Sequence, residues 1–268
     1  MLHIFIISLK QDIEKRATIS KTLNNFNLNF TFIDAVYGKE LSPEYLDSLR
    51  NRSSGKLANR GFPATPGEIG CTLSHIKAYQ EVIDRGLKWA CILEDDAILD
   101  SRFKVFIEKF RSDLLESENL YLLGGQTPGS KKNIVKSLKN IKTIGFQKFY
   151  KTIGSEDIIY RTCCYLISYE LAEKLTLLVD KKLLLADDWA YLVKNNYIKN
   201  IYLSNFVEHP IDLSDSNIQK ERHQAILDAK KNIITVNLNK RIKSFLISKL
   251  RLVALNTYRY IEKKDRSR

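Results

Sequence analysis

Short apolar runs alternate with amphipathic stretches between residues 2 and 203, and no other feature constrains the fold of this chain as much. The pattern predicts a strand at 2–9, a helix at 12–23 and a strand at 30–33. Strands that alternate with helices pair mostly in parallel, and ligands bind beyond the carboxyl ends of such strands. We therefore expect an α/β fold with a mostly parallel central sheet.

The same alternation continues along the chain. Further helices are predicted at 43–50, 66–83, 103–115 and 169–179, and further strands at 89–93, 120–123, 162–168 and 198–203. Two polar stretches, 50–65 and 124–156, are longer than ordinary connections, which favours a role as lids or acceptor-binding loops. Both are rich in Lys and Arg and therefore suit a phosphorylated or carboxylated acceptor, with a merely solvated surface as the alternative.

Three acidic residues, Glu94, Asp95 and Asp96, directly follow the apolar run at 89–93. They are expected where a buried strand reaches the edge of the sheet. Unpaired carboxylates are costly to bury, and a divalent ion with oxygen ligands stabilises such a cluster. Because Mg²⁺ and Mn²⁺ are usually held by one or two carboxylates together with substrate phosphates, the cluster favours a nucleotide-dependent transferase. The alternative is that the acids only cap the following segment.

A well-marked helix is predicted just before that strand. Thr65 occupies its N-cap position, Pro66 the first helical position, and Glu68 closes a capping box. Gly86 is a typical terminator of such a helix. Apolar residues form two adjacent stripes along it, so we expect this helix to be largely buried and to lie next to the acidic cluster.

Four motifs occur in a fixed order: residues 4–9 with Arg16, residues 67–75, residues 92–96, and residues 165–168 with 172–175. Together they resemble the signature of glycosyltransferase family 25, the lipooligosaccharide galactosyl- and glucosyltransferases of Gram-negative bacteria. The resemblance covers residues 1–215, far more than one short motif could support. It implies a GT-A-like, single Rossmann-type domain, a UDP-sugar donor, a divalent metal ion (Mn²⁺ or Mg²⁺) and inversion at the sugar carbon.

The resemblance also implies roles for individual residues. Glu94 and Asp96 have an E-x-D spacing that places one carboxylate toward the ribose or a metal-bound water and Asp96 on the metal. Asp95 lies between them, points the other way along a strand and is more often structural, although it borders the nucleotide-sugar site. The remaining residues expected around the nucleotide sugar are Ile7, Ser8, Leu9, Arg16, Asp34, Ser74 and His75. For His75, a satisfied core histidine is the alternative.

The catalytic base is expected downstream, where Asp187 and Asp188 precede Trp189. A carboxylate beside an aromatic ring suits a sugar and its attacking hydroxyl, and the sequence does not decide between the two acids. The alternative is that either Asp caps the helix that follows. His209 ends another apolar element and is a further candidate metal ligand, although it also fits a turn before Pro210.

The positive charge of this chain is concentrated at its end. Of the net charge of +12, +8 falls after Val236, where Ile242, Phe245 and Leu250 share one helical face with other apolar residues. We expect a catalytic domain at 1–235 and a basic amphipathic helix at 236–268 that binds an anionic membrane surface. Docking of this helix on the catalytic domain is the alternative. The expected location is cytoplasmic, peripheral on the inner face of the bacterial inner membrane.

The predicted function is a metal-dependent inverting glycosyltransferase that moves a hexose, with galactose expected, from a UDP-hexose to a hydroxyl of anionic lipooligosaccharide. A non-catalytic carbohydrate-binding protein and a metal-dependent nuclease are the alternatives. No nucleic-acid partner is expected, because the region with the motifs is much less basic than the tail and no nucleic-acid-binding motif appears. The four cysteines form no C-x-x-C pair, which indicates reduced buried thiols rather than disulfides or zinc ligands.

Overall fold

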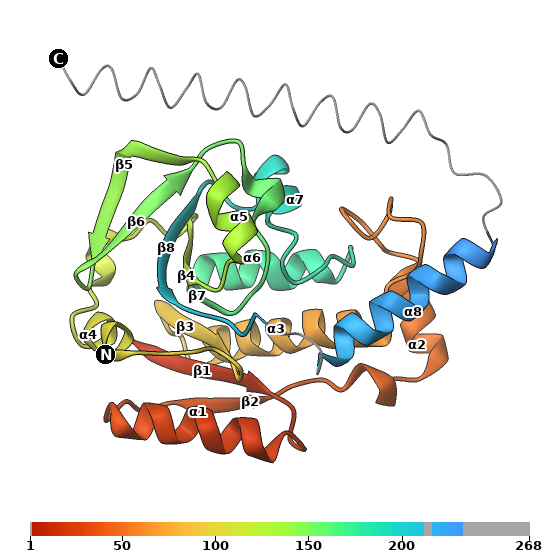
Figure 1. The fold of residues 1–268 in the computed structure, drawn as a ribbon, viewed down its shortest axis with the longest axis horizontal. Helices are drawn as coiled ribbons and strands as arrows, with labels where there is room; N and C mark the ends of the chain where they lie inside the picture. The colour runs from red at the N-terminus through yellow and green to blue at the C-terminus, as the bar shows by residue number, and fades with distance from the viewer. Residues whose placement is uncertain (1, 212–215, 233–268) are drawn as a thin grey trace.

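The computed structural model describes residues 2–211 and 216–232. The expected helix at 236–268 and the domain boundary before it lie outside the described residues. The described strands are β1 His3–Ser8, β2 Thr31–Asp34, β3 Trp89–Glu94, β4 Leu120–Gly124, β5 Lys136–Ile144, β6 Gln147–Thr152, β7 Cys164–Ser168 and β8 Ile201–Val207. The described α-helices are α1 Ile13–Asn25, α2 Pro43–Arg50, α3 Pro66–Asp84, α4 Ser101–Glu108, α5 Pro128–Asn133, α6 Tyr169–Val179, α7 Trp189–Lys194 and α8 Asn217–Asn232 (Figure 1).

The strands form one sheet in the order β2-β1-β3-β7-β4-β8-β6-β5. Strands β2, β1 and β3 pair in parallel, as do β4 and β8, whereas β7 lies antiparallel between β3 and β4. β6 also runs antiparallel to its neighbours β8 and β5. The α/β prediction is therefore confirmed, and most strands share one direction. The sheet is nevertheless mixed, because β7 and β6 run against the others.

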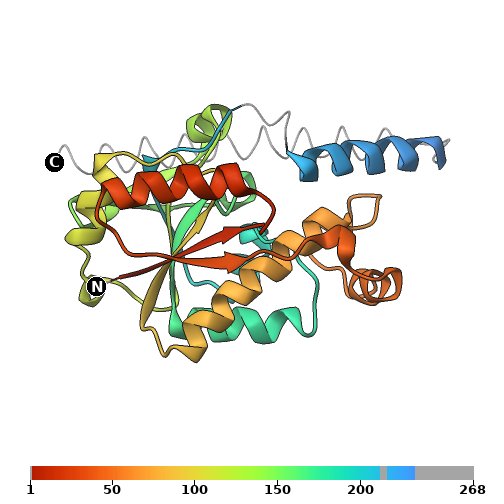
Figure 2. The same ribbon diagram turned by 90° about the horizontal axis from the view of Figure 1, so that it is seen from below.

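Helices cover both faces of the sheet, as Figure 2 shows for α1 on one side and α3 and α6 on the other. Alternate residues of β1 point to opposite faces, so Phe5 and Ile7 join one core cluster while Ile4 and Ile6 join the other. Because β1, β3 and β8 run in the same direction, their carboxyl ends lie at the same edge of the sheet. Within the described residues, no helix is both long and apolar enough to cross a membrane.

Two sequence predictions are wrong in their extent. The helix expected at 103–115 ends at Glu108, and a short 3₁₀ turn at Ser112–Leu114 follows in place of its last part. The stretch 124–156 is not one long loop, since it contains α5 and a β5–β6 hairpin that extends the sheet. The hairpin turns at Gly145 and Phe146, both at positive φ, a turn whose sequence is unlike the usual Asn-Gly signal.

The predicted capping box at the start of α3 is present. The Thr65 hydroxyl accepts from the backbone N–H of Glu68, and the Glu68 carboxylate accepts from the backbone N–H of Thr65. Only 1% of the Glu68 side chain is exposed, and its carboxylate also accepts hydrogen bonds from Arg60 and from Arg222 of α8. Glu221 of α8 accepts from the backbone N–H of Gly67 at 2.7 Å. Helix α8 is thus attached to the start of α3 through a buried carboxylate.

We expect Glu68→Gln to lower the free energy of unfolding by about 2 kcal/mol or more, because it leaves two arginines facing a neutral group. Burial opposes ionisation of Glu68, but hydrogen bonds from Arg60 and Thr65 lower its pKa from 4.5 to about 2. A lowered pKa stabilises the fold above the unfolded value, so this contribution is lost as the pH falls from about 4.5 to about 2. Urea unfolding across this range measures both effects.

The exposed Glu44 of α2 provides a matched control for this prediction. Glu44→Gln should change the free energy of unfolding by no more than about 0.5 kcal/mol. If Glu68→Gln unfolds with the wild-type pH dependence, Glu68 does not contribute to acid stability as described.

Candidate functional site

A carboxylate–histidine cluster lies at the edge of the sheet where β3 and β8 end. Glu94 is the last residue of β3, Asp96 lies just beyond it, and His209 follows β8. One ligand atom from each of these three residues lies within 4.8 Å of the other two. The Asp96 Oδ2 atom is 3.3 Å from the His209 Nε2 atom. The backbones of Ile98 and Glu208 pair in both directions, which holds the segment after β3 against the segment after β8.

The atoms of this cluster fit a divalent cation. Burial and the neighbouring Glu94 carboxylate raise the pKa of Asp96. The Asp96 Oδ1 atom is buried and has no hydrogen-bond partner among the described residues, and such an orphaned oxygen is stabilised by a metal ion. The His209 Nδ1 atom lies 2.8 Å from the Pro210 carbonyl oxygen and donates to it, so Nε2 is free to act as a ligand.

Glu94 also belongs to a polar network with Thr162, His75 and Tyr165. Its Oε1 atom accepts from the Thr162 hydroxyl and lies 3.4 Å from the His75 Nε2 atom. Burial opposes ionisation, but the hydrogen bonds from His75 and Thr162 keep the pKa of Glu94 below its usual value. The His75 Nδ1 atom is 2.7 Å from the Tyr165 hydroxyl. His75 is therefore a buried residue with hydrogen-bond partners that also contacts Glu94 of the carboxylate–histidine cluster.

Asp95 turns toward the opposite side of the strand, as alternation along a strand predicts. Its Oδ2 atom accepts from the Ser8 hydroxyl at 2.6 Å, and Lys15 lies 4.0 Å from its other oxygen. Burial raises the pKa of Asp95 to about 6, although the Ser8 hydrogen bond opposes this. Asp95 thereby connects the acidic cluster to the end of β1.

The residues expected to frame the nucleotide meet at the ends of β1 and β2. The Arg16 guanidinium donates to the Ser8 and Leu9 carbonyl oxygens and to the Asp34 carboxylate at 2.8 Å. The Arg16 hydrogen bond lowers the pKa of Asp34. Ile7 is 8% exposed, so its side chain belongs to the core and its backbone is what borders the site.

Ser74 has a different position from the other expected donor residues. Its side chain is 2% exposed, accepts from the Val36 backbone N–H at 2.8 Å and donates to the Gly70 carbonyl oxygen. Ser74 therefore links the segment after β2 to α3 through these two hydrogen bonds. Its hydroxyl is engaged in these two contacts.

The two candidate bases occupy different environments. Asp188 is 1% exposed and accepts from the Lys56 backbone N–H at 2.7 Å. Asp187 is half-buried and accepts from the Arg161 backbone N–H at 2.8 Å. In the described part of the chain, Asp188 stands at the N-cap position of α7 without a side-chain cap hydrogen bond, so the capping alternative is not met there. Of the two acids, Asp187 is therefore the one that is accessible to solvent.

Arg161 and Thr162 are site residues that the sequence analysis missed. Arg161 has a positive φ of 69°, a strained conformation for a side chain of this size. Its backbone N–H donates a hydrogen bond to Asp187, and its carbonyl oxygen accepts one from the Trp189 indole N–H. Its charge partly opposes the rise in the pKa of Asp96. Thr162 holds Glu94. No motif marks these residues, because their place depends on the antiparallel insertion of β7.

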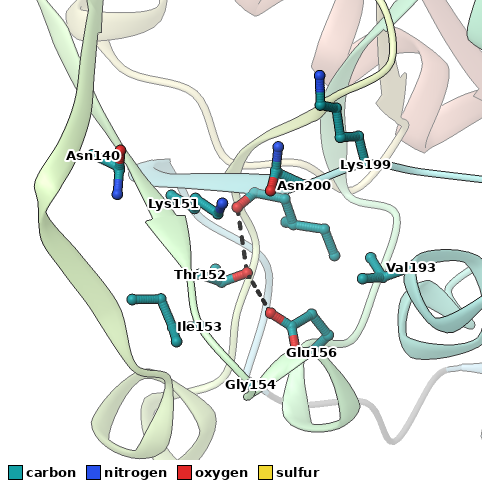
Figure 3. A pocket seen from close by; sticks show the side chains of 10 residues that line it. Asn140, Lys151, Thr152, Ile153, Gly154, Glu156, Val193, Lys199 and Asn200 are labelled. Carbon is teal, nitrogen blue, oxygen red and sulfur yellow. Dashed lines mark hydrogen bonds between the residues drawn. The ribbon is translucent and has the colours of Figure 1, made fainter. Parts of the chain in front are cut away.

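A separate groove of about 370 Å³ lies at the other end of β8 (Figure 3). Lys151, Thr152, Glu156 and Asn200 line it, and the Thr152 hydroxyl donates to Glu156. Residues 199–201 stand at the start of β8 and His209 beyond its end, a separation of about 20 Å of extended strand. The groove is therefore not part of the carboxylate–histidine cluster.

The chain matches the family described as glycosyltransferase family 25 (LPS biosynthesis protein) over residues 1–191. Procollagen galactosyltransferase 1 of Danio rerio is 27% identical over 78% of this chain and 34% of its own length. Procollagen galactosyltransferase 2 of Homo sapiens is 30% identical over 65% of this chain and 27% of its own length. The inactive glycosyltransferase 25 family member 3 of Homo sapiens is 29% identical over 54% of this chain and 25% of its own length.

This chain thus spans about a third or less of the length of these relatives. Among solved structures, the mannose-1-phosphate geranyltransferase of Thermus thermophilus superimposes on 78% of this chain and 74% of its own length. That match has a TM-score of 0.34 and 7% identity, too weak a likeness to assign a fold.

Proposed function

The chain belongs to glycosyltransferase family 25, and on that premise we propose that it is a metal-dependent, inverting hexosyltransferase. It moves a hexose from a UDP-sugar, with galactose as the first candidate, to a hydroxyl of an anionic lipooligosaccharide. The observation that carries this proposal is the carboxylate–histidine cluster of Glu94, Asp96 and His209 beside the ends of β1 and β2. A nucleotide diphosphate bound along this edge would place its phosphates against the cluster.

A divalent ion held by Asp96 and His209, with Glu94 as a direct or water-linked ligand, would neutralise the departing diphosphate. Residues of the chain bind the nucleotide and accept the proton of the attacking hydroxyl. Arg16 keeps Ser8 and Asp34 in place to bind the nucleotide. Asp187 accepts the proton of the attacking hydroxyl, and the Arg161 backbone orients its carboxylate. Holding the donor and acceptor in line supplies much of the expected rate increase.

The acceptor proposal rests on charge. Seven lysines fall between Lys131 and Lys151, in the segment that forms α5 and the β5–β6 hairpin. Such a surface attracts phosphorylated or carboxylated glycans. Because similar proteins are procollagen galactosyltransferases, a procollagen peptide is the acceptor to be compared directly with a phosphorylated core oligosaccharide.

A UDP-release assay with Mn²⁺ and a panel of UDP-sugars tests the proposed function. We expect acceptor-dependent UDP release with one donor, inhibition by a chelator, and recovery on adding Mn²⁺ or Mg²⁺. Activity that persists in excess chelator would contradict metal dependence. Transfer to the procollagen peptide alone would replace the lipooligosaccharide acceptor.

A non-catalytic sugar-binding protein is the second candidate, because one similar human protein is described as inactive. The two functions separate clearly in experiment. Saturable UDP-sugar binding without turnover, across all donors and acceptors tested, would support the binder and exclude the transferase.

The basic tail leads to a membrane prediction for the proposed enzyme, which would work on the cytoplasmic face of the inner membrane. Ten Lys or Arg and two acids follow Val236, and each basic residue near an anionic bilayer contributes about 1 kcal/mol. We expect the full chain to sediment with anionic vesicles at low salt and to be released at high salt. A variant ending at Val236 should stay folded, keep transferring to a water-soluble acceptor and lose sedimentation. Equal sedimentation of both chains would contradict this attachment.

A further inference from the structure

A second group of potential metal ligands lies on the other side of Glu94. Cys71 and His75 are one turn apart on α3, so their side chains lie on the same face of the helix. Together with Glu94 at the end of β3, each offers one ligand atom within 4.8 Å of the other two. Two of these ligands come from a helix and the third from a strand, which are rigid supports for a metal site.

The orientation of His75 suits metal binding. The Tyr165 hydroxyl donates to the Tyr79 hydroxyl at 2.9 Å, so its oxygen accepts the Nδ1 proton of His75. Nε2 then faces the Glu94 Oε1 atom at 3.4 Å, and a cation that binds both atoms takes the place of the proton they share. Histidine ligands are commonly oriented by such a hydrogen bond from the other ring nitrogen.

The spacing suits a small tetrahedral ion. Zn²⁺ binds nitrogen and oxygen ligands at about 2.0–2.1 Å, which separates two such ligands by about 3.3 Å at a tetrahedral angle. The observed 3.4 Å between His75 and Glu94 is close to this value. Cys71 is half-buried, and 23% of the Glu94 side chain is exposed, so the cluster is open to a solvent ion.

The charges around Cys71 favour a cation. Glu94, Asp187 and Glu68 act on the thiol from nearby, and Arg222 is the opposing positive group. Burial, with Glu94 and Asp187, raises the pKa of the Cys71 thiol. Zn²⁺ binds cysteine as the thiolate, so coordination by Zn²⁺ would release the thiol proton to solvent.

We propose that Cys71, His75 and Glu94 bind a thiophilic divalent ion, Zn²⁺ above all, with water as the fourth ligand. This Cys71–His75–Glu94 site differs from the carboxylate–histidine cluster in its sulfur ligand, which selects Zn²⁺ over Mg²⁺ and Mn²⁺. Because Glu94 belongs to both groups, Zn²⁺ at this site withdraws Glu94 from the donor site. Zn²⁺ is therefore an inhibitor of transfer, and only this last consequence rests on the proposed function.

Cobalt substitution tests the site without any activity measurement. We expect Co²⁺ added to the full-length wild-type chain to give the near-ultraviolet charge-transfer band of a cobalt–thiolate bond, and Zn²⁺ to abolish it. Cys71→Ser and Cys71→Ala should lack the band and bind Zn²⁺ at least about tenfold more weakly against a chromophoric chelator, a loss of about 1.4 kcal/mol. Circular dichroism establishes that both variants are folded.

Asp96→Asn is the matched control, because it alters the carboxylate–histidine cluster and leaves the sulfur site intact. It should keep the cobalt–thiolate band. Absence of the band in the wild type, or its persistence in both folded Cys71 variants, overturns the proposal. Loss of the band in Asp96→Asn also overturns it, because the thiolate would then depend on the other cluster.

Inhibition is measured separately. With Mn²⁺ held constant, Zn²⁺ should inhibit wild-type UDP release at concentrations at least about tenfold lower than those that inhibit Cys71→Ser. Equal inhibition of both proteins would overturn the inhibitory role. If no donor gives turnover but the cobalt–thiolate band appears as expected, the proposed transferase fails while the Cys71–His75–Glu94 site stands.

Discussion

Asp96→Asn should lower kcat/KM for sugar transfer by about 10³-fold and weaken Mn²⁺-dependent UDP binding. A metal ion supplies several kcal/mol of charge stabilisation, and a loss of roughly 4 kcal/mol corresponds to this factor. Asp96 provides both the carboxylate closest to His209 and a buried oxygen without a hydrogen-bond partner among the described residues. Steady-state kinetics and calorimetric titration of UDP with and without Mn²⁺ measure the two effects.

Asp100 offers a matched control four residues along the chain. It is exposed, caps α4 and pairs with Arg102, so Asp100→Asn removes the same charge away from the cluster. Its transfer rate should stay within about twofold of the wild type, because surface substitutions of this kind have small effects. Wild-type activity in Asp96→Asn, or an equal loss in both variants, would remove Asp96 from the metal site. Asp95→Asn should be milder than Asp96→Asn, since Asp95 turns toward Ser8.

Asp187→Asn should lower kcat by about 10²-fold or more while the donor binds with near-native affinity. Removing a general base affects the transition state more than the ground state, and this contribution is typically 10²–10⁴-fold. Asp187 is the accessible one of the two candidate acids, and the Arg161 backbone holds its carboxylate. Single-turnover kinetics with saturating donor separate the chemical step from binding.

Asp188→Asn, at the neighbouring acid, is the comparison for Asp187→Asn. Asp188→Asn alters a buried acceptor for the Lys56 backbone N–H, so we expect it to lower the free energy of unfolding by about 1–3 kcal/mol. Its kcat should change less than that of Asp187→Asn as long as the protein is folded. The opposite ranking of the two kcat values would identify Asp188 as the base, and small equal effects would exclude both.

Local sequence signals predicted several parts of the site. The capping box of Thr65 and Glu68 forms as expected, because its partners are only three residues apart. The acids after the apolar part of β3 lie at the edge of the sheet, since an apolar run of five residues is long enough to specify a buried strand. The opposite orientations of Asp95 and its two neighbours follow from the period of a strand.

Contacts between distant segments were not predictable in the same way. The antiparallel insertion of β7 places Thr162 against Glu94, although the two residues are 68 positions apart. The sequence predicts a loop where the β5–β6 hairpin forms, because the turn of this hairpin lacks the usual residues and one of its faces is polar. Cys71 showed no pairing signal, since its partners are a histidine and a carboxylate and not a second cysteine.

The sequence by itself determined the α/β class, the family, the positions of the acids at a strand end and the start of α3. Each depends on neighbouring residues, whose spacing along the chain sets the periodicity and the caps. Only the tertiary structure decided that His209 meets Asp96, that Asp187 is accessible while Asp188 is buried, and that Cys71 and His75 share Glu94. These outcomes depend on strand order and helix packing, and a single sequence carries no local signal for pairings that the whole core selects.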